Sequence, residues 1–439
     1  MLFERPGKVG LISIGEPYFD VPSAQSHLDA TRAALGHEYA LAGPAEVITD
    51  PAGFEQALAG LQAARPDALL LQIGTFPDGE HPARLAEALR VPVIVHSLPE
   101  PDLAHGVALN SLCGANLASF TLHALEHPYT TVHGDARSPA TALLLRAHLD
   151  AALALAGLHR LRVGMIGFRA PGFYPCAFDE LLLRRVLGVA IDHIGLNEMT
   201  AALQMAAPRP APGHAFPTIE GGTLSGEAVA AMERYYGAFT SLLERSGHQV
   251  IAIKDWPELF DVDSPGGFWP ALGWAADDGY AIAPEGDVNG AVTMALLGGL
   301  AGSPPFFADI CAWDDQDSTL ALWHYGAPPS LARREEEIRY GSEGREVEFT
   351  LRPGPATIAR VGLCRGSLRM LAIGVEITQA RVRLRRAGAR ARTLLTPAGA
   401  VVRRMLEDGW EHHVCLVHGD VLEQLRAIAR LAGMSITEL

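Results

Sequence analysis

The chain has 439 residues, of which 49% are apolar and 19% charged, with a formal net charge of -15. It is long enough for two or three domains, and so much apolar side chain excludes a globally disordered protein. The negative charge repels phosphate groups, which argues against a general nucleic-acid binder and against a binder of anionic membranes. All but two of the 35 basic residues are arginines; the lysines are Lys8 and Lys254.

Targeting signals and cysteine pairs are missing from the sequence. The N-terminal residues MLFERPGKVGLISIG place charges before a very short apolar run, which is not the pattern of a signal peptide. No uninterrupted apolar run is long enough to span a bilayer. The five cysteines lie far apart without a CxxC pair, which argues against a disulfide framework or a cysteine–zinc site. We therefore expect a cytoplasmic protein.

The first third of the chain alternates short apolar strands with helical segments. Strands are predicted over residues 9–14, 68–73 and 91–95, and helices over 24–35 and 143–158. Continuous apolar strands that alternate with helices predict a parallel sheet covered on both faces. We place an N-terminal α/β domain at residues 1–158.

The same pattern starts again in a second unit. Strands are predicted over 161–167, 189–194 and 248–253, helices over 180–187 and 224–246, and a proline-rich loop over 205–213. The last of these strands ends just before Lys254. We place a central α/β domain at residues 159–340 and expect it to carry the chemistry.

The character of the chain changes after residue 340. Short strands are predicted over 346–351, 357–361, 369–373 and 381–384, separated by glycine and proline, and a helix over 421–431. This spacing indicates an antiparallel sheet or small barrel at residues 341–439. The predicted fold class is therefore α/β: two units with mostly parallel sheets, followed by a C-terminal antiparallel β-rich domain.

Three carboxylates stand out in the central part of the chain. Glu285 and Asp287 precede an apolar helix over 291–300, where the helix dipole favours negative charge. Asp287 is best explained as an N-cap, whereas Glu285 lies one or two positions too early for that role. Asp309 ends the apolar run 305–308. It is either a ligand-binding group at the end of a strand or a turn residue, and spacing alone does not decide.

Histidines supply the other candidate ligands. His324 shares a strand face with Leu320 and Leu322, and a lone histidine there is more often a hydrogen-bonded core residue than a ligand. Only one of the neighbours His412 and His413 can face a given cavity from a regular strand. Two carboxylates with one or two histidines suit a divalent cation such as Mn²⁺ or Mg²⁺. The sequence has no P-loop, no GxGxxG after the first strand, and no GxSxG or HExxH motif.

Several of these segments together resemble the L-fucose/L-arabinose isomerase superfamily. The matching residues, in order, are KDWPE at 254–258, EGDVNGA at 285–291, FAD at 307–309, HYG at 324–326, and HHV at 412–414 followed by GD at 419–420. Weaker matches are SLCG at 111–114 and GFRAPG at 167–172. The resemblance covers nearly the whole chain, and its specific motifs lie in the second half.

The resemblance implies two α/β domains, a C-terminal β-rich domain and an aldose–ketose isomerase that acts through a cis-enediol. The implied cofactor is Mn²⁺ or another divalent cation such as Mg²⁺ or Co²⁺. By motif position, Glu285 and Asp309 are implied as metal-binding carboxylates that also move protons. His413, or its neighbour His412, is implied as a late ligand, and His324 as the ligand of the arabinose branch. The implied assembly is a homo-oligomer, a trimer or hexamer, with active sites between subunits.

Two departures from the family pattern concern the sugar pocket. Pro284 and Tyr325 stand where the family often has cysteine. Both leave the ligands in place but are expected to reshape the pocket, which favours a sugar other than fucose or arabinose. The alternatives are an isomerase of a modified sugar (sulfonated, phosphorylated or deoxy) and a non-catalytic sugar-binding protein on the same scaffold.

We assign four residues to the substrate pocket: Lys254, Trp256, His412 and Tyr325. Lys254 is either a pocket cation that orients the substrate or a surface partner of Asp255 or Glu258. Trp256 is either a packing residue or a stacking surface for the sugar. The sequence leaves both choices open.

Overall fold

The computed structural model describes residues 7–210, 225–259, 267–334, 338–340, 346–380 and 386–439. This described part divides into two compact units. The N-terminal unit consists of residues up to 157 together with residues 423–434, and the barrel unit of residues 158–422 together with residues 435–439.

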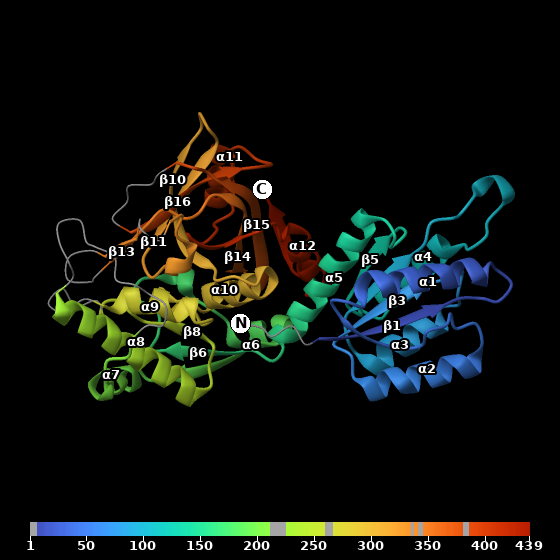
Figure 1. Cartoon of the computed structure of the whole chain (residues 1–439), viewed down its shortest axis with the longest axis horizontal. Helices are drawn as coiled ribbons and strands as arrows, with labels where there is room; N and C mark the ends of the chain where they lie inside the picture. Colours follow the sequence, from blue (N-terminus) through green and yellow to red (C-terminus); the bar gives the residue numbers. More distant parts are fainter. Residues whose placement is uncertain (1–6, 211–224, 260–266, 335–337, 341–345, 381–385) are drawn as a thin grey trace. The chain divides into compact units, whose positions relative to one another are not determined.

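The N-terminal unit is built on a five-stranded parallel sheet, drawn in blue and teal in Figure 1. Its strands in spatial order are β2 (Ala40–Ala42), β1 (Lys8–Ile14), β3 (Ala68–Ile73), β4 (Val93–Ser97) and β5 (Tyr129–His133). Its helices are α1 (Val21–Leu35), α2 (Pro51–Ala64), α3 (Glu80–Leu89), α4 (Ser111–Ala124), α5 (Pro139–Leu158) and nearly all of α12 (Leu422–Leu431). Every residue of β3 is buried, as expected for a strand covered on both faces.

Helix α5 is the one helix among the described residues that is long and apolar enough to cross a membrane. Its polar side chains are used within the N-terminal unit: Asp150 accepts a hydrogen bond from the Tyr39 hydroxyl at 2.9 Å, and Arg146 pairs with Glu38 at 2.7 Å. A single helix of this kind is a weak sign of a membrane span, because the buried core helix of a globular unit passes the same test.

The barrel unit begins with a second, four-stranded parallel sheet. Its strands in spatial order are β7 (Ala190–Ile194), β6 (Arg162–Ile166), β8 (Val250–Ile253) and β9 (Ala281–Ala283). The helices of this unit are α6 (Glu180–Leu187), α7 (Leu196–Met205), α8 (Gly226–Ser246), α9 (Phe268–Asp277), α10 (Val288–Ala301) and α11 (Ala398–Glu407). Both predicted parallel sheets are therefore present.

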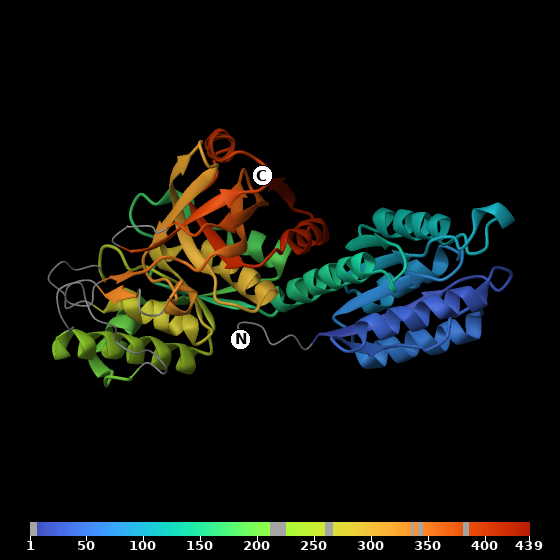
Figure 2. The ribbon, with the colours of Figure 1, turned by 45° about the horizontal axis from the view of Figure 1, so that its top comes forward.

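A closed antiparallel barrel follows the second sheet (Figure 2). Among the described residues its six strands, in order around the barrel, are β14 (Gly354–Cys364), β17 (His413–His418), β10 (Phe306–Asp314), β11 (Thr319–His324), β16 (Ala387–Thr393) and β15 (Ser367–Ile377). Strand β15 pairs again with β14 to close the ring, and β18 (Ser435–Glu438) adds to β15 in parallel. The short strands β12 (Arg339–Tyr340) and β13 (Val347–Glu348) form a separate ribbon. These elements confirm the predicted fold class.

The sequence boundaries differ from the structure in places. Two barrel strands, β10 and β11, come from before residue 341, where we place the start of the C-terminal domain. The strand predicted over 346–351 is regular only in β13, and the one predicted over 381–384 lies outside the described residues. The boundaries of the three predicted domains remain a prediction.

Helix α10 joins the two halves of the barrel unit. It is buried on nearly all sides and contacts β8 and β9 of the parallel sheet as well as β14 and β17 of the barrel. A helix that is apolar all round is expected in such an interior position. The N-terminus of α10 therefore lies where the parallel sheet meets the barrel, and the candidate site is built around it.

Candidate active site

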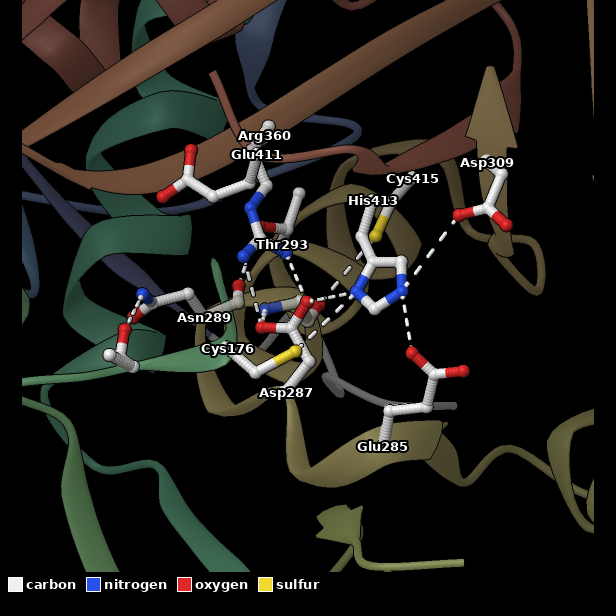
Figure 3. A network of polar contacts seen from close by, with 12 residues as sticks. Cys176, Glu285, Asp287, Asn289, Thr293, Asp309, Arg360, Glu411, His413 and Cys415 are labelled. Atoms are coloured by element: carbon white, nitrogen blue, oxygen red, sulfur yellow. Dashed lines mark hydrogen bonds and ion pairs between the residues drawn. The ribbon is translucent and has the colours of Figure 1, made fainter. Parts of the chain in front are cut away.

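Four sequence-predicted residues are brought together by separate elements of the barrel unit. Glu285 lies in the 3₁₀ turn η3 (Pro284–Gly286) after β9, and Asp309, His324 and His413 lie on β10, β11 and β17. Asp309 stands directly opposite His413 in the antiparallel register, so both side chains share one face of the barrel wall. Figure 3 shows Glu285, Asp309 and His413 directed toward one another.

Three buried atoms in this cluster fit a bound cation. Nε2 of His413 lies 2.9 Å from Oε2 of Glu285 and 3.8 Å from Oδ1 of Asp309. All three atoms are buried without a hydrogen-bond partner among the described residues, because the short approach of His413 to Glu285 is not aligned as a hydrogen bond. Buried polar atoms normally have a hydrogen-bond partner, so three buried atoms that converge without one indicate a missing partner. One imidazole and two carboxylates suit Mn²⁺ and related divalent cations.

His324 and His412 extend the group of possible ligands. Ligand atoms of Asp309, His324 and His413 all lie within 4.8 Å of one another, and so do those of Glu285, His412 and His413. Both sets share His413, which is almost fully buried, whereas His412 is exposed and its ring lies 4.0 Å from that of His413. His413 is therefore the member of the pair that faces the interior cluster.

The second ring nitrogen of His413 is held by a buried ion pair. Nδ1 lies 2.9 Å from Oδ2 of Asp287, and Asp287 also receives two hydrogen bonds from Arg360, at 2.6 and 3.0 Å. Burial alone would raise the pKa of Asp287, but Arg360 and His413 hold that pKa well below its usual range. Because the carboxylate is ionised, Nδ1 of His413 carries the hydrogen and Nε2 is directed toward Glu285 and Asp309.

Asp287 also caps a helix, as predicted. Its Oδ1 accepts a hydrogen bond from the backbone N–H of Gly290 at 2.8 Å, which begins α10. The same carboxylate therefore caps the N-terminus of α10 and orients His413. Without a cation, the facing carboxylates raise the pKa of His413 well above its usual value, against the effect of burial. A cation that binds Nε2 would displace a proton.

Glu285 is fixed by its backbone and by one of its carboxylate oxygens. The residue has a left-handed conformation (φ 61°), and its N–H donates to Oδ1 of Asp255 at 2.8 Å. The hydroxyl of Tyr325 donates to Oε1 at 2.8 Å, which leaves Oε2 for the cluster. Gly286 follows with φ 69° and lies so close to Phe168 that a Cβ would be 2.4 Å from its carbonyl oxygen. Only glycine fits there, and this contact helps set the turn.

The local structure predicted for Asp309 is wrong in both forms. The residue is neither at the end of a parallel strand nor in a turn, because β10 continues to Asp314. It pairs with β17 and β11 on its two sides, and a bulge follows between Ile310 and Ala312. Burial, with the nearby charge of Glu285, raises the pKa of Asp309 to about 6.

His324 occupies the buried strand face that the sequence predicts. It shares that face with Leu320 and Leu322, and its Nδ1 donates to the backbone oxygen of Tyr325 at 3.2 Å. Burial, with the positive charge of His413 beside it, lowers the pKa of His324 to about 3. His324 is therefore a neutral imidazole whose Nε2 is left for a ligand.

Lys254 and Trp256 lie on the loop after β8. Lys254 pairs with Glu258, which is the surface ion pair of our second interpretation, although the lysine side chain is only 16% exposed. The ring of Trp256 is partly exposed and lies 5.4 Å from that of Phe173, and Phe173 meets the edge of His412 at 6.0 Å. Three rings thus gather beside the cluster and offer an apolar surface.

Sequence reasoning missed two buried contributors. Arg360 lies on β14 within a run of apolar residues, and Cys176 places its sulfur 3.8 Å from Nδ1 of His413. The signal for Arg360 was present, because a charge inside an apolar strand requires a buried partner. Cys176 had no such signal, because its neighbour is 237 positions away in sequence.

Comparison with known proteins supplies a reaction class. No protein-family model matches the chain. The chain is 28% identical over 440 residues to a sulfoquinovose isomerase of Alkalicoccus urumqiensis, with 98% of each chain covered. It is 26% identical over 441 residues to one of Priestia megaterium and 27% identical over 444 residues to one of a Clostridium species, with 96% of this chain and 97% of each relative covered. This full-length similarity indicates an aldose–ketose isomerase, an intramolecular oxidoreductase.

Proposed function

We propose that the protein is a divalent-cation-dependent isomerase of a sulfonated hexose, acting between an aldose and a ketose. The observation that carries the proposal is the convergence of the orphaned atoms of Glu285, Asp309 and His413. The names of the full-length relatives support the substrate class, since sulfoquinovose is a hexose that carries a sulfonate on carbon 6. This choice favours the modified-sugar alternative over fucose or arabinose. Membership of the L-fucose/L-arabinose isomerase superfamily remains a prediction.

We assign the cation to Glu285, Asp309 and His413, with His324 as a further ligand. When bound, a cation such as Mn²⁺ would stabilise negative charge that develops on the neighbouring sugar oxygens. The identity of the cation is part of the proposal, and Mg²⁺ or Co²⁺ would suit the same donor set.

The side chains of the cluster divide the proton transfers. Isomerisation removes the proton on C2, delivers a proton to C1, and moves a hydroxyl proton from O2 to O1. Glu285 and Asp309 are the two carboxylates that can accept the first proton and return one to the adjacent carbon. Tyr325 holds Oε1 of Glu285, so Oε2 is the atom assigned to this exchange. Asp287 keeps the Nδ1 hydrogen of His413 away from the sugar.

The pocket wall is assigned to aromatic and basic side chains. Trp256 and His412 lie beside the cluster with Phe173, and we assign them to the sugar face. Lys254 is kept as a substrate contact through its partly buried position. A homo-oligomer, either a trimer or a hexamer, and a cytoplasmic location also remain predictions; light scattering after size exclusion tests the first.

The decisive experiment measures exchange of the C1 and C2 protons in deuterated water. The panel contains sulfoquinovose, glucose, fucose and arabinose, each with Mn²⁺ and with EDTA. We expect exchange and ketose formation with sulfoquinovose, and their loss in EDTA. Binding of a sugar without any exchange would instead support the non-catalytic alternative. Turnover of fucose or arabinose alone would restore the first interpretation of the sequence.

A further inference from the structure

Arg386 is held among three aromatic side chains beside the candidate site. The residue immediately precedes β16, and its side chain is 17% exposed. Its guanidinium carbon lies 4.7 Å from the ring centre of Trp323, 5.0 Å from that of Tyr325 and 5.2 Å from that of Trp269. Rings on several sides hold a guanidinium in place and limit its hydration. Such a group is prepared to bind an anion without first having to be ordered.

One of these rings links Arg386 to the reacting end of the site. Tyr325 contacts the guanidinium with its face and donates its hydroxyl to Glu285 at 2.8 Å. One aromatic ring therefore separates the positive charge from the carboxylate assigned to proton transfer. The same charge acts on the cluster: it opposes the rise in the pKa of Asp309 that burial causes, and it adds to the fall in the pKa of His324.

The positive charge of Arg386 is weakly neutralised among the described residues. Its one ion pair there is with Glu346, through Nε at 3.4 Å, and the Glu346 side chain is 26% exposed. Two other cations near the site are already paired: Lys254 contacts Glu258, and Arg360 makes a bidentate pair with Asp287. The terminal nitrogens of Arg386 make no hydrogen bond to any other described residue.

We propose that Arg386 binds the anionic end of the sugar while the carbonyl end lies at Glu285, Asp309 and His413. This inference rests on the proposed function and names the group that selects its substrate. A guanidinium presents paired N–H donors that match a tetrahedral oxyanion. Sulfonate and phosphate share that chemistry, and we assign the subsite to a sugar that carries either group on its terminal carbon.

The test compares Arg386→Gln with Arg386→Lys and with Arg392→Gln. Arg392 is an exposed residue on the same strand, so its substitution removes an equal charge away from the site. We measure kcat and KM for sulfoquinovose, glucose 6-phosphate and glucose. Arg386→Gln loses a charge-assisted hydrogen bond to the anionic group. We therefore expect the KM of the anionic sugars to rise about 10- to 100-fold. We expect glucose to change by less than threefold, Arg386→Lys to restore part of the loss, and Arg392→Gln to match the unmodified protein.

Calorimetry in EDTA separates this inference from the proposed function. Binding of sulfoquinovose in EDTA that is lost in Arg386→Gln, by a protein that shows no turnover when Mn²⁺ is restored, would overturn the proposed function and leave the anion subsite standing. Equal binding by the unmodified protein and Arg386→Gln would overturn the subsite, as would equal losses for all three sugars. Failure of the unmodified protein to bind either anionic sugar would also overturn the subsite.

Arg169, beside the glycine that follows Glu285, is the competing cation. Selective loss of anionic sugars in Arg169→Gln and not in Arg386→Gln would move the subsite there.

Discussion

Asp287 and His413 lie 2.9 Å apart, 126 positions from each other in the sequence, and each depends on the other. The carboxylate fixes which ring nitrogen carries the hydrogen, and the imidazole is one of two partners that keep the carboxylate ionised. Arg360 is the other, and both members of the Arg360–Asp287 pair are fully buried. A buried pair of this kind is costly to break from one side only.

Asp287→Asn should therefore destabilise the barrel unit strongly. Asparagine can still cap α10, but Arg360 would remain as a buried charge without a counter-charge. Removal of one partner of a buried pair costs about 3–5 kcal/mol of unfolding free energy. All six tryptophans lie in the barrel unit, so their fluorescence in urea follows this unit selectively.

Two further variants make the Asp287 prediction decisive. Asp287→Asn combined with Arg360→Met should recover a large part of the loss, because no unpaired charge is left. Asp314→Asn makes the same chemical change in a partly exposed ion pair on β10 and should cost far less unfolding free energy than Asp287→Asn. Equal losses in Asp314→Asn and Asp287→Asn would contradict the explanation.

Glu285→Gln and Asp309→Asn should each abolish most proton exchange while the fold is kept. Each removes one of the two groups that we propose to move the carbon-bound proton, and such groups contribute about 10²- to 10⁴-fold to the rate. Calorimetric titration with Mn²⁺ should also show weaker binding by both variants, which is a readout independent of turnover. Asp314→Asn again serves as the matched control for the substitution on β10. Unchanged exchange in either site variant would remove that residue from the mechanism.

Tyr325→Phe should lower kcat while the protein stays folded. The variant keeps the ring against Arg386 but loses the hydroxyl that holds Oε1 of Glu285. A hydrogen bond to a charged group is worth about 1.5–3 kcal/mol, so we expect a fall in kcat of about tenfold or more. Tyr340→Phe is the control, because its buried hydroxyl contacts Trp274 instead of the cluster. A similar loss of kcat in both variants would point to a general packing effect.

The N-terminal unit should lose stability at mildly acidic pH through His96. This histidine is fully buried on β4, and burial lowers its pKa to about 4, below the ordinary histidine value of about 6.5. The unfolded chain therefore takes up a proton below pH 6.5, where the folded chain does not. Stability falls as pH drops from about 6.5 to 4, by about 1.4 kcal/mol per pH unit at most and about 3 kcal/mol in all.

Hydrogen exchange of the β4 amides measures this effect locally. The stability advantage of the unmodified protein over His96→Gln should be largest and constant above about pH 6.5 and shrink steadily as pH falls toward 4, since only the histidine loses stability in acid. A difference that does not depend on pH between 4 and 7 would rule out His96 as the titrating group. The comparison of two proteins cancels the contribution of other titrating residues.

The sequence predicts most of the parallel sheets and the four residues of the central cluster. Buried strands such as β3 are continuous apolar runs, so their ends are visible without any knowledge of their neighbours. The barrel is harder, because β10 closes onto β17 across more than 100 positions and no local pattern reports that pairing. For the same reason Asp309 is assigned to a strand end or a turn, although it lies inside a barrel strand.

The supporting side chains are less visible in the sequence than the cluster itself. Glu285, Asp309, His324 and His413 lie in motifs that resemble a known superfamily. Arg360 interrupts an apolar strand and was open to prediction as the partner of a buried acid. Arg386 has no such mark, because its three rings come from α9, from β11 and from the residue after β11, and meet only in the folded barrel.

In the proposed cation site, the pairing of Asp309 with His413 also sets the moment at which an ion could first be captured. The ligand-bearing segments begin at Glu285 and end at His413, so a chain still emerging from the ribosome has an incomplete coordination sphere until β17 has been synthesised and inserted beside β10. Loading of the proposed ion would then be a late event in maturation. Any slip of β17 by one residue would turn His413 outward and leave the apoprotein unable to be metallated.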